Sequence, residues 1–229
     1  MPRDMISSKE INGSIFAHDD GNKESELRQL FKKNKKIKFA HMVLTEVKDY
    51  FGENIFNSAF KVSTIRNPYV HAVSEFNHLF TRNRLPKRIK EEVDTNLTLF
   101  KNDKGFRQKI FLKYLEERIE YGIINHLKNF YFINDVYQLN YLIRQEKINQ
   151  DLTTLFEKIG VEESLKNEVL LLTNTPVNLA LEKYKFYEYL NKTSLKLINQ
   201  YQSYIFKLGN YEKVNNRKEL FDSLKKFNK

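Results

Sequence analysis

Residues 60–76 constrain the fold of this chain more than any other segment of similar length. The part from Phe60 to Ile65 is rich in apolar and β-branched residues, which favour a buried β-strand. Arg66 and Asn67 follow, and then Pro68, whose fixed φ suits the first turn of a helix. We therefore expect a strand, a tight turn and a helix, which is the start of an α/β unit.

The same turn brings together groups that favour an anion. Arg66 ends the expected strand, and Ser74 lies in the first turns of the expected helix. The free backbone N–H groups and the macrodipole at a helix N-terminus also favour negative charge. We therefore expect a phosphate site here, in which the planar guanidinium of Arg66 makes a bidentate contact.

This stretch resembles a signature of the carbohydrate-type sulfotransferases, enzymes that use phosphoadenosine phosphosulfate (PAPS). Their pattern reads approximately V-R-N-P-[YW]-D-R-[LVA]-[VL]-S-x-[YF], and the chain is similar to it at Arg66, Asn67, Pro68, Tyr69, Val73, Ser74 and Phe76. In the family, the arginine and the serine grip the 3′-phosphate of the nucleotide, so the resemblance assigns that role to Arg66 and Ser74. Val70 replaces a usual acidic residue, and His71 replaces a usual second arginine.

Three other segments resemble the family in the same order along the chain. Before the phosphate strand, the matching positions are His41, Glu46, Val47, Phe51 and Gly52. After it, a strand that runs into R-x-E-x-[LI]-x-x-D-[FL] and a helix ending at L-G-[IV] are matched at Arg144, Glu146, Ile148, Asp151, Leu152, Gly160 and Val161. Residues 178–211 resemble a tyrosine-rich region whose helix ends near F-G-Y.

Two interpretations of Arg144 and Glu146 remain open. They either form a charged pair that closes the edge of the sheet or contact the substrate directly. The tyrosines of residues 178–211 are expected to pack in the core or in a lid.

The family's phosphosulfate loop has only a partial counterpart here. That loop reads P-K-[TC]-G-[GS]-T-[ST]-[IL], and its lysine and backbone amides bind the phosphosulfate. Residues 8–15 keep Lys9 and Ser14 at matching offsets but place Glu10 where the loop approaches an anion. The resemblance implies that Lys9 stabilises the leaving group and that Ser14 contacts the cosubstrate. The alternative is an irregular N-terminus over residues 1–22.

Sulfuryl transfer also needs a general base that takes a proton from the acceptor hydroxyl. The resemblance favours His41 in this role because its segment directly precedes the phosphate strand. His71 and Glu75, on the helix that carries Ser74, are second choices. No metal is expected, because the chain lacks cysteine and its histidines do not have the spacing of zinc ligands.

Helical periodicity supports a helix-rich chain. Apolar residues recur at three- and four-residue steps over residues 106–122 and again from 194 to 208. A further helix is expected over residues 69–84, ended by the basic stretch 82–88, which is either a solvated loop or an acceptor-binding edge.

The sequence therefore predicts one α/β domain over residues 1–229, with the P-loop-like sulfotransferase fold implied by the resemblance: a short parallel sheet flanked by many helices. Residues 212–229 would form a basic C-terminal helix or tail. The implied activity is sulfuryl transfer from PAPS to a hydroxyl acceptor, a glycan or a small molecule. No stretch has the length and apolarity of a membrane span or a secretory signal, which favours a cytoplasmic setting.

Two alternatives to a sulfotransferase remain. One is a protein that keeps the fold but has lost turnover and acts by binding. The other is a nucleic-acid-binding protein, which the formal net charge of +10 supports although no recognised nucleic-acid motif is present.

Overall fold

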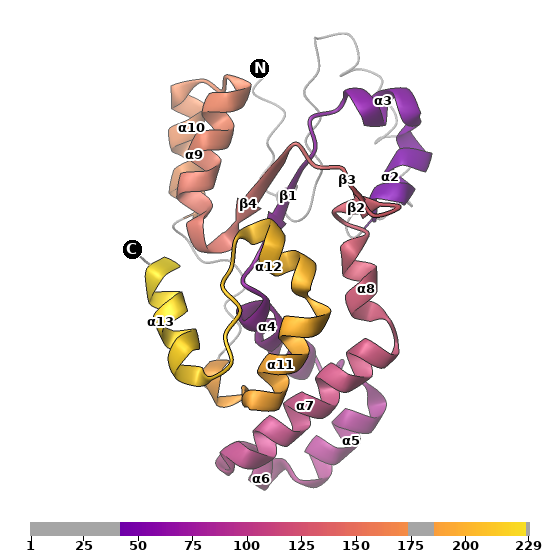
Figure 1. The fold of residues 1–229 in the computed structure, drawn as a ribbon, viewed down its shortest axis with the longest axis vertical. Helices are drawn as coiled ribbons and strands as arrows, with labels where there is room; N and C mark the ends of the chain where they lie inside the picture. The colour runs from indigo at the N-terminus through magenta and orange to yellow at the C-terminus, as the bar shows by residue number, and fades with distance from the viewer. Residues whose placement is uncertain (1–41, 174–185, 228–229) are drawn as a thin grey trace.

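A computed structural model describes residues 42–173 and 186–227 of the chain. It is mostly helical, with a short parallel sheet at the centre (Figure 1). Strands β1 (Val62–Ile65) and β4 (Tyr141–Arg144) pair in parallel, in a register that places Ile65 opposite Arg144. The coarse expectation of a short parallel sheet with many flanking helices is therefore confirmed.

The turn after β1 leads into helix α4 (Pro68–Thr81), as expected from the Asn-Pro pair. The helix ends before the basic stretch, where Asn83 adopts the left-handed conformation with φ of 56° and Leu85 is buried. Helix α5 (Lys87–Thr95) then begins. The basic stretch is therefore a short turn followed by the start of a helix rather than a loop throughout.

The connection from β1 to β4 consists mainly of the helices α5, α6 (Leu97–Asn102), α7 (Lys104–Glu120) and α8 (Ile123–Lys128). Of these, α5, α6 and α7 lie at one end of the molecule and α8 leads back toward the sheet (Figure 1). Helix α7 corresponds to the periodic stretch 106–122, and Asp103 caps it by accepting a hydrogen bond from the backbone N–H of Phe106.

A small antiparallel hairpin that the sequence analysis did not predict precedes β4. It joins β2 (Phe132–Ile133) to β3 (Val136–Tyr137). Both turn residues, Asn134 and Asp135, have positive φ, which is the conformation that the tightest hairpin turns need.

Different helices cover the two faces of the sheet. Helix α9 (Ile148–Ile159) packs Leu155 against Val62 and Ile143, and α10 (Glu163–Thr173) lies beside α9 (Figure 1). Toward the other face, Leu142 contacts the cluster around helices α2 (Leu44–Phe51) and α3 (Glu53–Ser58). Helix α9 ends at Gly160, as the resemblance implies, and α2 ends at Gly52; both glycines have positive φ.

The C-terminal part contains η3 (Phe186–Glu188), α11 (Lys192–Tyr201), α12 (Ser203–Gly209) and α13 (Arg217–Phe227). The periodic stretch 194–208 is therefore two helices that meet at Gln202, not one. The expected basic segment at the C-terminus is helical over α13.

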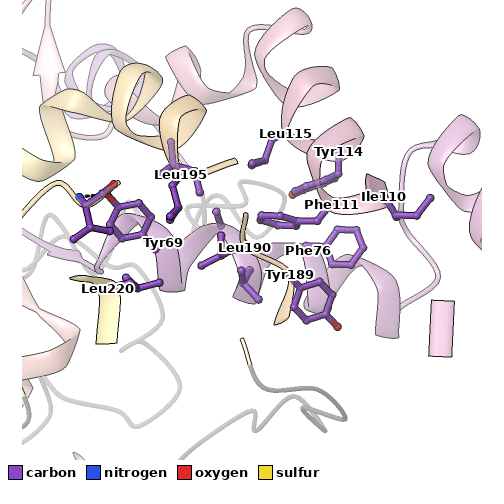
Figure 2. Packing of buried hydrophobic residues seen from close by; sticks show 14 of the residues in the cluster. Tyr69, Phe76, Ile110, Phe111, Tyr114, Leu115, Tyr189, Leu190, Leu195 and Leu220 are labelled. Atoms are coloured by element: carbon purple, nitrogen blue, oxygen red, sulfur yellow. Dashed lines mark hydrogen bonds between the residues drawn. The ribbon is translucent and has the colours of Figure 1, made fainter. Parts of the chain in front are cut away.

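The main core lies between α4, α7 and the C-terminal helices (Figure 2). The ring of Phe76 lies at its centre, with centroid distances of 5.6 Å to Phe111, 5.1 Å to Tyr114 and 5.5 Å to Tyr189. This packing fixes the inner face of α4 and thereby the direction in which its outer face points.

Candidate functional site

The candidate site lies where β1 and β4 end side by side. Because the two strands are parallel and Ile65 pairs with Arg144, the residues that follow them emerge at the same edge of the sheet. Arg66 and Asn67 follow β1, and the short helix η2 (Gln145–Lys147) follows β4. In open α/β sheets this carboxyl edge is the usual place for a ligand.

Asn67 closes the N-terminus of α4. Its side-chain oxygen accepts hydrogen bonds from the backbone N–H groups of Tyr69 at 3.0 Å and Val70 at 3.5 Å. The expectation that these amides are free for an anion is therefore wrong, because the chain caps its own helix. These two amides are therefore not available to an anion.

Glu146 joins three of the segments that the sequence analysis selected. One carboxylate oxygen accepts a hydrogen bond from the backbone N–H of Asn67 at 2.6 Å, and the other accepts one from the hydroxyl of Tyr211 at 2.7 Å. Burial, and next the hydrogen bond to Glu146, raise the pKa of Tyr211 well above its ordinary value, which keeps its hydroxyl a donor. Segments far apart in the sequence are thus fastened at one carboxylate.

Arg144 pairs with Asp151 in the first turn of α9. The guanidinium donates to both carboxylate oxygens, at 2.8 and 2.6 Å, and the Arg144 backbone N–H donates to the same carboxylate. Burial alone would raise the pKa of Asp151, but these hydrogen bonds and the charge of Arg144 lower it. Of the two interpretations of Arg144 and Glu146, the charged pair between them is therefore wrong, because Arg144 pairs with Asp151.

Arg66 and Ser74 have side chains that are available to a ligand. Both residues are half-buried, and neither side chain forms a hydrogen bond or ion pair with the part of the chain that the structure describes. Ser74 lies on the outer side of α4, opposite the buried face formed by Ala72, Val73 and Phe76. A guanidinium and a hydroxyl can each donate a hydrogen bond to an oxyanion.

A second set of charged groups lies along the outer side of α4. Glu75 forms an ion pair with Arg118 of α7, and the Arg118 guanidinium lies 5.9 Å from the ring centre of Tyr114. The Tyr114 hydroxyl and the Nε of Arg118 are buried and have no hydrogen-bond partner among the described residues.

His71 lies among these charges. Burial lowers its pKa below the ordinary value; Glu75 opposes this shift, and the nearby guanidinium groups of Arg66 and Arg118 reinforce it. These surroundings therefore favour the neutral imidazole.

Arg118 lies in the periodic stretch 106–122, for which a helix but no functional role was predicted. The available signal was its placement: a guanidinium four residues after Tyr114 and three after Leu115 interrupts an apolar stripe, and both of those residues are buried. Charged residues rarely lie on a buried face unless they are paired.

Tyr69 fastens the C-terminal segment above the start of α4. Its hydroxyl donates to Asn199 of α11 and accepts a hydrogen bond from the backbone N–H of Val214 at 2.8 Å. Burial raises the pKa of Tyr69 to about 12. Together with Tyr211, it holds residues 211–214 close to the strand ends.

The other predicted site residues, Lys9, Ser14 and His41, lie outside the described residues. Within residues 42–173 and 186–227, no helix is long and apolar enough to cross a bilayer. Across that same portion, no group of three or more histidine, aspartate or glutamate side chains is arranged to hold a metal ion.

Comparison with known proteins gives no relative. No protein-family model, no curated protein and no solved structure matches the chain significantly.

Proposed function

We propose that this protein is a PAPS-dependent sulfotransferase that transfers a sulfuryl group to a hydroxyl acceptor, with a carbohydrate as the expected class of acceptor. The observation that carries the proposal is the meeting of three family-like segments at Glu146. The segments around Arg66, Arg144 and Tyr211 resemble the family in the same order, and the Glu146 contacts join them at one edge of the sheet.

The proposal assigns the 3′-phosphate of the nucleotide to Arg66 and Ser74. Arg66 supplies a forked donor that matches the geometry of a phosphate, and Ser74 supplies a hydroxyl donor. Lys9 and Ser14 are assigned to the phosphosulfate and His41 to the general base, all three by resemblance. In this proposal the described sheet belongs to a P-loop-like sulfotransferase fold.

The reaction balances without a metal or a redox partner. The acceptor hydroxyl oxygen attacks the sulfur of PAPS, and the bond between sulfur and the bridging phosphate oxygen breaks. The electron pair of that bond leaves with phosphoadenosine phosphate (PAP), and the base receives the hydroxyl proton. Donors aimed at the bridging oxygen stabilise the charge that develops there.

The test is a transfer assay with ³⁵S-labelled PAPS. The full chain would be incubated with a panel of neutral and anionic oligosaccharides and simple phenols, and label in the acceptor would be counted. Arg66→Ala should lower transfer at least about a hundredfold, because a charged hydrogen-bonding partner of the cosubstrate is lost. Lys104→Ala, which removes an exposed cation at the start of α7 outside the basic stretch 82–88, is the control and should retain activity.

A protein that has kept the site without turnover is the second candidate. Glu10 favours it, since a carboxylate in the loop would oppose the phosphosulfate. This candidate predicts that PAP binds and that no acceptor is labelled. Absence of both PAP binding and transfer would contradict the sulfotransferase proposal and this candidate together.

A further inference from the structure

His71 lies between two sets of charged groups on α4. Its backbone N–H donates to the Asn67 carbonyl at 2.8 Å, so it lies one helical turn after the strand end that carries Arg66 and Glu146. Four residues further along α4, Glu75 pairs with Arg118 of α7. The charges of these groups act on the His71 imidazole. His71 is half-buried, one helical turn before Ser74 and on the same side of α4. The side chains of His71 and Ser74 therefore both lie on the outer side of α4.

Both carboxylates near His71 are already engaged. Glu75 pairs with Arg118, and Glu146 accepts from the backbone of Asn67 and from Tyr211. Arg66 has no ion pair or side-chain hydrogen bond within the described residues, so its positive charge is uncompensated by direct contact. Among the described residues, His71 therefore has no carboxylate beside it that is not already engaged by another group.

We infer that His71 is a further phosphate-contacting residue: it takes up a proton when an oxyanion binds at Arg66 and donates an N–H to that oxyanion. The inference rests on the proposed function in so far as the physiological anion is the nucleotide's 3′-phosphate. A bound dianion offsets the charge of Arg66 and supplies the missing acceptor, and both effects favour the imidazolium. Ligand binding and protonation of His71 are then linked, so each promotes the other.

The experiment is an NMR pH titration of the histidine rings of the full chain. Spectra would be recorded without ligand, with saturating PAP and with sodium sulfate, and assigned with His71→Gln and His78→Gln. Sulfate stays a dianion over the pH range in which histidine titrates. A pH dependence of sulfate binding therefore reports ionisation of the protein and not of the ligand. The exposed His78, on the same helix, is the control.

The expected result is a rise of about one unit or more in the pKa of His71 with PAP and with sulfate, and no change at His78. The affinity of wild type for sulfate should fall about tenfold as the pH rises from the pKa of His71 without ligand to its pKa with sulfate bound. His71→Gln should remove most of this pH dependence. Arg66→Ala should abolish the shift at His71.

The remaining outcomes separate the two proposals. If PAP binds but the His71 titration does not move, the inference is overturned while the nucleotide site stands. If PAP fails to bind but sulfate raises the pKa of His71, the anion contact is supported and the sulfotransferase proposal is contradicted. If neither ligand has an effect, both are overturned.

Discussion

Helix α4 has two sides that differ in chemistry. Its inner side places Phe76 in a cluster of buried aromatic residues (Figure 2). Its outer side carries His71, Ser74 and Glu75, which lie among charged groups at the end of the sheet. The core gains stability from apolar burial, whereas the outer side holds polar groups in position, and substitutions on the two sides should have different effects.

Truncation of the core aromatic should give the largest loss of stability. Phe76→Ala removes a ring that contacts Phe111, Tyr114 and Tyr189, and we expect a cost of about 3–5 kcal/mol. For a chain of this size the melting temperature should fall by roughly 10 °C, measured by circular dichroism. Leu99→Ala, at a position that is 51% exposed, is the control and should change it little. Equal effects of the two substitutions would contradict the assigned core.

Arg107 of α7 is a buried charged residue that belongs to the core region and not to the candidate site. Its guanidinium donates to the carbonyls of Phe100 and Lys101, at 3.1 and 3.0 Å, and to Glu188 at 2.8 Å. Arg107→Ala should cost roughly 3 kcal/mol, at the low end for a buried pair because Glu188 keeps contact with water. Chemical denaturation measures this loss, and PAP affinity of the folded variant should be unchanged. Weaker PAP binding by the folded variant would contradict the view that the core and the candidate site act independently.

Loss of the Glu146 carboxylate should affect both stability and ligand binding. Glu146→Ala leaves the backbone N–H of Asn67 and the Tyr211 hydroxyl without their acceptor, and we expect a loss of about 1–3 kcal/mol. PAP binding should weaken because Glu146 no longer holds the backbone of Asn67, the residue next to Arg66. Isothermal titration calorimetry would detect the loss of PAP affinity. Glu146→Gln retains an amide oxygen and should lose less. An unchanged PAP affinity in Glu146→Ala would remove Glu146 from the site.

The pH dependence of stability should show the smallest effect. The pKa of His71 is lower in the folded protein than its ordinary value near 6.5, so the unfolded chain binds the proton more readily. The His71 contribution to stability is thus present above pH 6.5 and is lost as the pH falls toward the lowered pKa. Urea midpoints at pH 7.5, 6.5 and 5.5 should fall less steeply in His71→Gln. Parallel curves for the two proteins would show that His71 does not titrate in this way.

Local sequence predicted the local parts of this structure. The strand, the turn and helix α4 follow from the apolar run and from Asn67-Pro68, and the left-handed end of α9 follows from Gly160. The hairpin was missed although Asn134 and Asp135, two residues that tolerate positive φ, lie between aromatic-rich strands. The break at Gln202 was missed because the apolar spacing continues across it.

Pairing between distant residues was harder to predict. Arg144 has two carboxylates within a few residues, and sequence spacing cannot show that Asp151, one turn into α9, faces it while Glu146 turns toward Asn67. The roles of Glu75, Arg118 and Tyr114 depend on how α4 packs against α7. Such contacts depend on tertiary structure, which periodicity does not contain.

The most direct test of the proposed site is the affinity of the full chain for PAP, measured by isothermal titration calorimetry in wild type, Arg66→Ala and Lys104→Ala. The account predicts that wild type and Lys104→Ala bind PAP with equal affinity and that Arg66→Ala does not bind it measurably. Equal binding by wild type and Arg66→Ala, or no binding by wild type, would contradict the assignment of the strand-end site to the nucleotide.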